Sequence, residues 1–286
     1  MKKSIKVAKN SGFCFGVRRA IEIAEKTVKP NKKIFSLGPL IHNPQEVKRL
    51  ENIGIKKIEN TKSLKNKVLI LRTHGIPHGL KEKLKIQNLV IVDATCPFVK
   101  RAQDIVEKLA KAKKKILIVG EKKHPEIKAL VSYGGSHCYV VEQSSDLKNL
   151  DLSGDICVVS QTTQSPQNFK NFVSIIKKIN PQAAIYNTIC KATIDRQTAA
   201  KELSKKVDVM VVVGGKNSGN TKRLAQICSK FTKTYYVETA LEIKPQWFKK
   251  TKNIGISAGA STPDWIIKEV RKKIEENVNK QGAGNG

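Results

Sequence analysis

Three cysteines in this sequence have closely similar surroundings. Cys14, Cys96 and Cys190 each follow an apolar run and open a helical pattern, in CFGVRRA, CPFVKRA and CKATIDR. A helix amino terminus stabilises a thiolate, which is the form of cysteine that ligates iron. Because the usual cluster takes four such ligands, three would leave one iron open, and an open metal position indicates chemistry. The pattern therefore predicts an iron–sulfur cluster that does more than hold the fold together.

Cysteine is also a common small residue of protein cores. We assign that role to Cys138, Cys157 and Cys228, which lie inside strand or helix patterns. A single cysteine at a helix start is compatible with either role, whereas three at related positions favour the cluster. No two cysteines have the CxxC spacing of a zinc ribbon, and the sequence shows no sign of export, so we expect thiols rather than disulfides.

The cysteines also mark an internal repeat. Their separations are 82 and 94 residues, and 28 residues after each one lies a polar residue that follows the next apolar strand. These polar residues are His42, His124 and Ser218. A second strand in each repeat leads into another polar turn, around His74, Thr162 and Ser261. Equal intervals of this kind predict one structural unit used three times.

Short apolar runs alternate with amphipathic helical patterns, which is typical of parallel α/β units. About twelve strands are expected, at 5–8, 34–37, 54–58, 68–72, 89–94, 116–120, 138–142, 155–160, 183–188, 209–215, 234–238 and 253–259. The predicted fold is α/β: three pseudo-repeated parallel-sheet units in a closed trefoil-like arrangement around a central cluster. The predicted domains are 15–96, 97–190 and 191–286, the last completed by the N-terminal strand of residues 1–14.

Polar residues at the predicted strand ends form a candidate cradle for a phosphate or diphosphate, because histidines, hydroxyls and amides near helix amino termini suit anions. They are His42, His74, His124, Gln161, Thr162, Thr163, Ser218, Asn220 and Ser261. Helix capping is the alternative role for Ser218, Ser261 and Glu126. Glu126, among histidines near an open iron, is a candidate proton donor.

The segment 214–221, GGKNSGNT, has the glycine spacing of a phosphate-binding P-loop. Asn220 stands where that motif needs its lysine, so we expect an anion site here and no ATPase.

The formal net charge is +30, but only 8 of the 54 basic residues are arginine, and the lysines are spread over every predicted helix. This distribution favours a solvated lysine-rich surface over nucleic-acid binding, and the positive field would attract a small anion. No apolar run is long enough to span a membrane, and the amino-terminal residues do not form a secretory signal. We therefore predict no membrane association and a cytoplasmic location.

Eight motifs in this order, GFCFGVRRA, RTHGIP, DATCP, HPEI, SQTT, NTIC, KNSGN and SAGAS, closely resemble the 4-hydroxy-3-methylbut-2-enyl diphosphate reductase family (IspH or LytB). The resemblance covers nearly the whole chain and leaves only QGAGNG, residues 281–286, as an expected flexible tail. This sequence departs from the family at Gly219, where a second serine is usual. One hydroxyl donor to phosphate is therefore lost, while the backbone N–H is kept.

The resemblance implies a [4Fe–4S] cluster on Cys14, Cys96 and Cys190 with one open iron. It implies reductive removal of the allylic hydroxyl of 4-hydroxy-3-methylbut-2-enyl diphosphate, giving isopentenyl and dimethylallyl diphosphates, the last step of the methylerythritol phosphate route to isoprenoids. Glu126, Thr162 and His124 would be catalytic. The implied substrate-binding residues are His42, His74, His124, Thr162, Ser218, Gly219, Asn220 and Ser261. The electron donor would be a ferredoxin or flavodoxin. The protein would be a monomer or a weak homo-oligomer.

Three alternatives remain at this stage. Another three-cysteine cluster enzyme, such as one resembling quinolinate synthase, is disfavoured by the HPE and SAGAS motifs. The second alternative is a basic protein that binds nucleic acid and has inert cysteines. Its binding to nucleic acid would depend steeply on salt concentration. An iron–sulfur protein with a structural or sensing role would hold a cluster without removing a hydroxyl.

Overall fold

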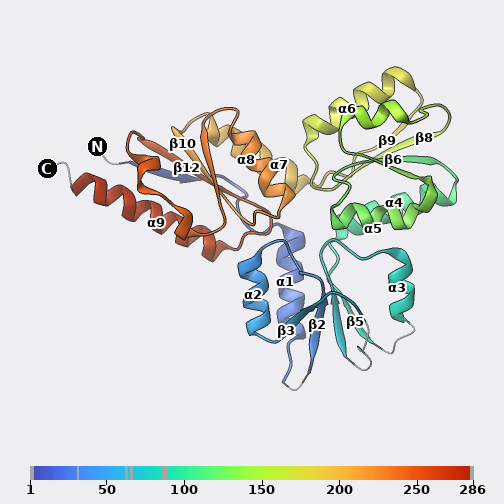
Figure 1. Ribbon diagram of the computed structural model, residues 1–286, viewed down its shortest axis with the longest axis horizontal. Helices are drawn as coiled ribbons and strands as arrows, with labels where there is room; N and C mark the ends of the chain where they lie inside the picture. The colour runs from blue at the N-terminus through green and yellow to red at the C-terminus, as the bar shows by residue number, and fades with distance from the viewer. Residues whose placement is uncertain (1–2, 31, 62–63, 65–66, 86–88, 284–286) are drawn as a thin grey trace. The chain divides into compact units, whose positions relative to one another are not determined.

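Twelve parallel strands form three four-stranded sheets in the part of the chain that this computed structural model describes, residues 3–30, 32–61, 64, 67–85 and 89–283. All pairings between the strands are parallel. Each predicted strand is present with bounds shifted by a few residues at most. The predicted fold class, three repeated parallel α/β units, is confirmed (Figure 1).

The first two sheets share one strand order. The first, β3-β2-β4-β5, consists of β2 (Ile34–Leu37), β3 (Ile55–Ile58), β4 (Val68–Leu71) and β5 (Val90–Asp93). The second, β7-β6-β8-β9, consists of β6 (Lys115–Val119), β7 (Cys138–Val141), β8 (Ile156–Ser160) and β9 (Ala184–Tyr186). Their helices are α1 (Phe15–Thr27), α2 (Pro44–Asn52) and α3 (His78–Lys85), then α4 (Pro97–Lys111), α5 (Pro125–Gly134) and α6 (Pro166–Ile179). Proline at the first position of α4, α5 and α6 sets the helical φ where no N–H partner is needed.

The third sheet repeats this order only because the amino-terminal strand joins it. Its order is β11-β10-β12-β1, with β1 (Ser4–Val7), β10 (Val209–Val213), β11 (Lys233–Val237) and β12 (Asn253–Ala258). The pairing of β1 with β12 places Val7 opposite Ile256. The helices are α7 (Lys191–Ser204), α8 (Gly219–Cys228) and α9 (Asp264–Ala283). The prediction that the first strand completes the last unit is confirmed, and Figure 1 shows the blue β1 beside the orange β12.

Among the described residues, four short 3₁₀ helices lie in the connections of the second and third sheets. They are η1 (Gly135–His137), η2 (Ser144–Asn149), η3 (Ala240–Glu242) and η4 (Pro245–Phe248). Helix α9 includes residues 281–283 of the predicted flexible tail, so the helix extends three residues farther than expected, and residues 284–286 lie outside the described residues.

Three glycines repeat one hydrogen bond in the three sheets. Gly38, Gly120 and Gly214 each lie 24 residues after the cysteine of their repeat. Their N–H groups donate to the last carbonyl of the neighbouring outer strand, at 2.7 Å to Ile58, 3.0 Å to Val141 and 2.9 Å to Val237. The repeat that the cysteines indicate thus extends to backbone hydrogen bonds that end the first strand of each unit.

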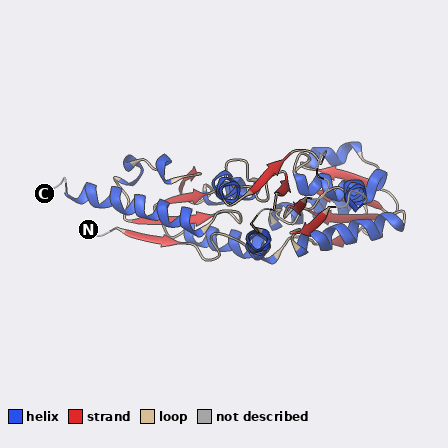
Figure 2. Cartoon of the chain, turned by 90° about the horizontal axis from the view of Figure 1, so that it is seen from below, coloured by secondary structure: helices blue, strands red, loops and turns tan. Residues whose placement is uncertain are grey.

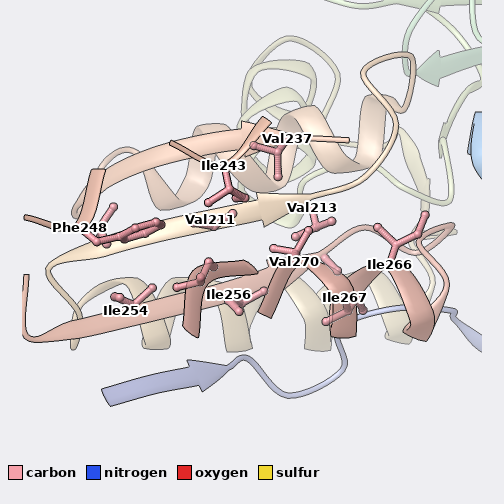
Figure 3. Close-up of a cluster of buried hydrophobic side chains, with 13 residues drawn as sticks. Val211, Val213, Val237, Ile243, Phe248, Ile254, Ile256, Ile266, Ile267 and Val270 are labelled. Carbon is pink, nitrogen blue, oxygen red and sulfur yellow. The ribbon is translucent and has the colours of Figure 1, made fainter. Parts of the chain in front are cut away.

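The third sheet is covered on both faces, which explains why its central strand is apolar throughout. Val209, Val211 and Val213 face a core formed with α9 and Phe248 of η4. Met210 and Val212 face the opposite way, into a core formed with α7 and α8. This alternation follows from the two-residue period of a strand. Figure 3 shows the first core, with Ile256 and Val270 pointing toward each other across it, and Figure 2 shows α9 running alongside the strands.

The chain forms two compact units. Unit 1 consists of the described residues of Met1–Arg18, Ile41–Arg49 and Lys191–Gly286, and contains the third sheet. Unit 2 consists of the described residues of Arg19–Leu40 and Leu50–Cys190, and contains the first and second sheets. In unit 2, the Ser132 hydroxyl on α5 accepts a hydrogen bond from the His78 N–H of α3 at 2.9 Å. The predicted domain boundaries at 15–96, 97–190 and 191–286 with 1–14 stay a prediction.

Among the described helices, none combines the length and the apolar composition that crossing a membrane requires.

Replacing Ile256 by alanine should lower the free energy of unfolding of unit 1 by about 2–5 kcal/mol, since Ile256 of β12 is fully buried in the core that the third sheet forms with α9. Ile179, which is 60% exposed at the end of α6, is the matched control. Ile179→Ala should change the stability by no more than about 0.5 kcal/mol. Chemical denaturation followed by circular dichroism measures both, and equal effects of the two substitutions would contradict the packing described above.

Candidate functional site

Each of the three cysteines that the sequence selects lies at the start of a helix. Cys14 directly precedes α1, Cys96 is the N-cap of α4, and Cys190 directly precedes α7. All three side chains are partly exposed. The preceding strands end earlier than expected, because residues 8–13, 94–95 and 187–189 connect them to the cysteines. The predicted helix starts are confirmed. The prediction that each cysteine ends a strand is wrong, because a short connection separates each strand from its cysteine.

One backbone hydrogen bond recurs at all three cysteines. The cysteine N–H donates to the carbonyl of a residue in the polar turn after the neighbouring strand, at 3.1 Å from Cys14 to Ala260, 3.0 Å from Cys96 to Thr73 and 2.9 Å from Cys190 to Thr162. These turns follow β12, β4 and β8. Each cysteine is therefore fixed beside the turn that carries the predicted polar residues of its own repeat.

Of the other three cysteines, Cys157 and Cys228 are core residues, as predicted, while Cys138 is partly exposed. Cys157 of β8 is 4% exposed and Cys228 at the end of α8 is fully buried. Cys138 of β7 packs against the core between the second sheet and its helices. Burial raises the pKa of Cys138 to about 11 and that of Cys228 to about 12, and it also raises the pKa of Cys157. Thiols held protonated in this way are poor metal ligands, because the thiolate is the ligand.

In unit 2, Glu126 and Thr162 form a buried carboxylate–hydroxyl pair. Glu126, the second residue of α5, is 1% exposed. Its Oε1 accepts a hydrogen bond from the Thr162 N–H at 2.6 Å, and its Oε2 accepts one from Thr162 Oγ1 at 2.8 Å. Helix capping, the alternative for Glu126, is therefore not its role here, since His124 caps α5 by accepting the Glu126 N–H at 3.1 Å.

Burial dominates the charge state of Glu126. It raises the pKa of this carboxyl from 4.5 to about 7, although the two hydrogen bonds from Thr162 favour the ionised form. A carboxyl with a pKa near neutrality can both give and take a proton at working pH, which is the property of a general acid.

Two histidines of unit 2 lie beside this pair. The rings of His74 and His124 meet edge to face with centroids 5.3 Å apart. His74 Nδ1 lies 3.3 Å from the hydroxyl of Thr73, whose carbonyl accepts the N–H of Cys96. A continuous series of contacts thus connects Cys96 with Cys190, and its members in order are Cys96, Thr73, His74, His124, Glu126, Thr162 and Cys190.

The neighbours of Thr162 support the loop. Gln161 is fully buried, and its Oε1 accepts the N–H of Glu121 at 3.0 Å. Its Nε2 donates to Thr163 Oγ1 at 3.1 Å. Both predicted cradle residues therefore hold the turn that presents Thr162.

In unit 1, the amino terminus of α8 carries three predicted residues. Ser218 is the N-cap and accepts the N–H of Thr221 at 3.3 Å, so its capping role is confirmed. Gly219 and Asn220 are the first two residues of the helix. Asn220 is 8% exposed, and neither its Oδ1 nor its Nδ2 has a hydrogen-bond partner among the described residues. A buried amide of this kind indicates a ligand or an ordered water at the site.

His42 and Ser261 are joined in unit 1, as the Ser261 hydroxyl donates to the His42 carbonyl at 3.0 Å. Ser261 is 7% exposed and follows Ala260, the carbonyl partner of Cys14. A Cβ on Gly215 would lie 2.9 Å from the same His42 carbonyl, so glycine lets this segment approach the turn before α8. The meeting of unit 1 residues with those of unit 2, including the three cysteines with one another, stays a prediction.

Comparison with known proteins identifies the family of this chain. The model of the LytB protein family matches residues 5–275. The chain belongs to the LytB protein family.

Relatives in this family carry one name. The 4-hydroxy-3-methylbut-2-enyl diphosphate reductase of Pelobacter propionicus is 45% identical and aligns with 96% of this chain and 98% of its own. The protein of the same name from Campylobacter jejuni subsp. doylei is 48% identical over 95% of this chain and 98% of its own.

Two solved structures are also similar to this chain. A structure of (E)-4-hydroxy-3-methyl-but-2-enyl diphosphate reductase, described as the terminal enzyme of the non-mevalonate pathway, has a TM-score of 0.71 and 42% identity, covering 96% of this chain and 99% of that one. The E-1-hydroxy-2-methyl-but-2-enyl-4-diphosphate reductase from Plasmodium falciparum has a TM-score of 0.90 and 29% identity, covering 96% and 88%.

Arg196 is a residue of this LytB chain that sequence reasoning missed. It is 2% exposed on α7, and its Nη2 donates to the Gly12 carbonyl at 2.7 Å, two residues before Cys14. It lies six residues after Cys190, and the residues six after the other two cysteines are the buried Ala20 and Ala102. Alignment of the three repeats on their cysteines could have singled out this arginine.

The pKa of Glu126 predicts how the stability of this LytB chain depends on pH. Because the native carboxyl binds its proton more tightly than the unfolded one, its contribution to stability is fully present below about pH 4.5 and is lost as the pH rises through about 7. The loss is roughly 3 kcal/mol by linkage. Glu126→Gln should remove this part of the pH dependence, which urea denaturation between pH 4 and pH 8 measures.

Glu22→Gln is the matched control for that experiment, because Glu22 lies on the exposed side of α1. Its pH profile of stability should follow that of the unchanged protein in this range. Parallel profiles for Glu126→Gln and the unchanged protein would contradict the raised pKa.

Proposed function

We propose that this chain reduces 4-hydroxy-3-methylbut-2-enyl diphosphate to isopentenyl and dimethylallyl diphosphates. Two electrons and two protons are consumed, the allylic C–O bond breaks, the oxygen leaves as water, and the carbon skeleton takes up the second proton. The observation that carries the proposal is the buried Glu126–Thr162 pair, held between the turns of two predicted cluster ligands. The names of the relatives support the substrate.

The cysteines fit the proposed [4Fe–4S] cluster. Cys14, Cys96 and Cys190 are partly exposed thiols at helix amino termini, fixed by equivalent backbone hydrogen bonds. Cys157 and Cys228 are buried in cores, Cys138 packs against a core, and burial raises the pKa of all three thiols. We propose that the first three hold the cluster, which when bound would supply single electrons and an open Lewis-acidic iron.

The residues around Glu126 can manage the proton that the hydroxyl needs. At a pKa of about 7, Glu126 is partly protonated at neutral pH. Thr162 Oγ1, 2.8 Å from Oε2, can pass a proton between the carboxyl and a substrate oxygen, while the Thr162 N–H keeps the carboxyl in position. Protonation makes water the leaving group in place of hydroxide. His124 fixes the first turn of α5, because its ring caps the Glu126 N–H.

The diphosphate is proposed to bind the polar residues that the sequence predicts as its cradle. In unit 1, the Asn220 amide has no partner among the described residues, and the backbone N–H groups at the start of α8 favour an anion. Ser218, Gly219 and Ser261 belong to the same unit, with His42. His74 and His124 are the proposed contributors of unit 2.

A ferredoxin or flavodoxin is the proposed electron donor. The cytoplasmic location and the monomeric or weakly homo-oligomeric state stay predictions.

The product assay tests the function directly. Protein purified without oxygen, reduced with dithionite or a reduced flavodoxin and given the allylic diphosphate, should release both five-carbon diphosphates, measured by mass spectrometry. Cluster-containing protein that leaves the substrate unchanged would overturn the proposed activity and favour a structural or sensing role.

Replacing each proposed ligand by serine should remove iron and sulfide from protein purified without oxygen. Cys14→Ser, Cys96→Ser and Cys190→Ser should each lose most of the cluster absorption. Cys138→Ser, Cys157→Ser and Cys228→Ser are the controls, because those side chains pack in cores. Full iron content in any of the first three variants would remove that residue from the ligand set.

Glu126→Gln should keep the cluster absorption and lower turnover by about 100-fold or more, since the amide cannot deliver the proton. Glu202→Gln, at an exposed position on α7, should retain full turnover. Near-normal turnover of Glu126→Gln would exclude Glu126 as the acid.

A further inference from the structure

Thr221 makes two hydrogen bonds to one oxygen at the amino terminus of α8. It is the third residue of the helix and is fully buried. Its N–H donates to Ser218 Oγ at 3.3 Å, and its own hydroxyl donates to the same Ser218 Oγ at 3.0 Å. The first bond is the ordinary N-cap contact, whereas the second adds a donor that capping does not need.

These two bonds restrict what the Ser218 hydroxyl can do. A serine hydroxyl has one proton to donate and two lone pairs to accept with. Thr221 supplies donors to both lone pairs, so Ser218 keeps only its proton for a further partner. Such a hydroxyl binds an acceptor, for example an unprotonated phosphate oxygen, and has no acceptor capacity left for a donor.

The Thr221 hydroxyl is enclosed by two glycines. A Cβ on Gly214 would lie 2.9 Å from Thr221 Oγ1, and one on Gly259 would lie 2.0 Å from it. Each glycine directly follows a strand of the third sheet, and Gly214 also has a positive φ of 148°. Thr221 therefore fits where two turns lack side chains, and the enclosure keeps its hydroxyl directed at Ser218.

A second side chain at this terminus points to a ligand independently. Asn220, next to Thr221, is 8% exposed, and both polar atoms of its amide lack a partner among the described residues. Burial of an amide without partners costs free energy, which a bound anion and its water would offset.

We propose that Thr221 is a positioning residue for diphosphate. By donating to Ser218, it turns the Ser218 proton toward a phosphate oxygen at the amino terminus of α8. The proposal rests on the proposed function for the identity of the full substrate and extends it to the group that orients the donor. It also bears on Gly219, because with glycine in place of the usual serine, Ser218 is the hydroxyl that remains in this turn, and its orientation matters more.

The test measures binding of inorganic diphosphate to the cluster-containing protein by calorimetry without oxygen. Thr221→Val keeps the branched shape and removes the hydroxyl. It should weaken diphosphate binding by roughly three- to tenfold, the effect of one hydrogen bond. Thr221→Ser restores the hydroxyl and should bind within about twofold of the unchanged protein. In turnover assays Thr221→Val should raise KM by the factor seen in binding and leave kcat unchanged.

A double-mutant cycle separates positioning from general loosening. If Thr221 acts through Ser218, adding Thr221→Val to Ser218→Ala should cause no further loss of diphosphate affinity. Thr232→Val is the matched control, since Thr232 lies after the end of α8 and its hydroxyl donates to the Asp208 carbonyl at 2.9 Å. It should leave diphosphate affinity unchanged.

Unchanged affinity in Thr221→Val, additive losses in the double variant, or a Thr221→Ser variant as weak as Thr221→Val would each overturn the proposal. Thermal unfolding of all variants identifies a loss of affinity that comes from loss of fold. Inorganic diphosphate reports on this site without turnover. A chain that binds it as expected but leaves the allylic diphosphate unreduced would refute the proposed function and leave the role of Thr221 standing.

Discussion

The backbone hydrogen bond from each predicted ligand cysteine to the turn beyond the neighbouring strand is the contact on which the site depends. It joins Cys14 to Ala260, Cys96 to Thr73 and Cys190 to Thr162. A thiol at a helix start gains a favourable field, but only a fixed backbone places it next to the groups it works with. Because the strands within each sheet are parallel, the turns that follow them lie at the same edge of that sheet. The same contact can therefore recur in each repeat.

The repeat is not symmetric where chemistry is expected. After β8 the turn carries Thr162, which holds the Glu126 carboxyl in a site that excludes water. After β4 it carries His74, whose ring meets His124, and after β12 it carries Ser261, which binds the His42 carbonyl. One backbone frame thus presents an acid, an imidazole pair and a hydroxyl.

The same division applies to the helices that follow the cysteines. Two of them bury an alanine six residues along, while α7 buries Arg196, which reaches the carbonyl of Gly12. At the start of α8 the glycines of two turns leave space for Thr221 and so allow it to orient Ser218. Small residues on the helices and in the turns therefore determine where a buried polar side chain can fit.

The sequence by itself determined the strands, the repeat and the helix starts at the cysteines, because these depend on local periodicity and on constant intervals along the chain. It also separated Cys157 and Cys228 as core residues, since both lie inside apolar patterns. Only the tertiary structure decided that Glu126 meets Thr162, that Arg196 reaches Gly12, and that the Ser261 hydroxyl binds a carbonyl instead of capping a helix. Those contacts join residues far apart in the chain, and burial, which no local pattern measures, brings the pKa of Glu126 to about 7.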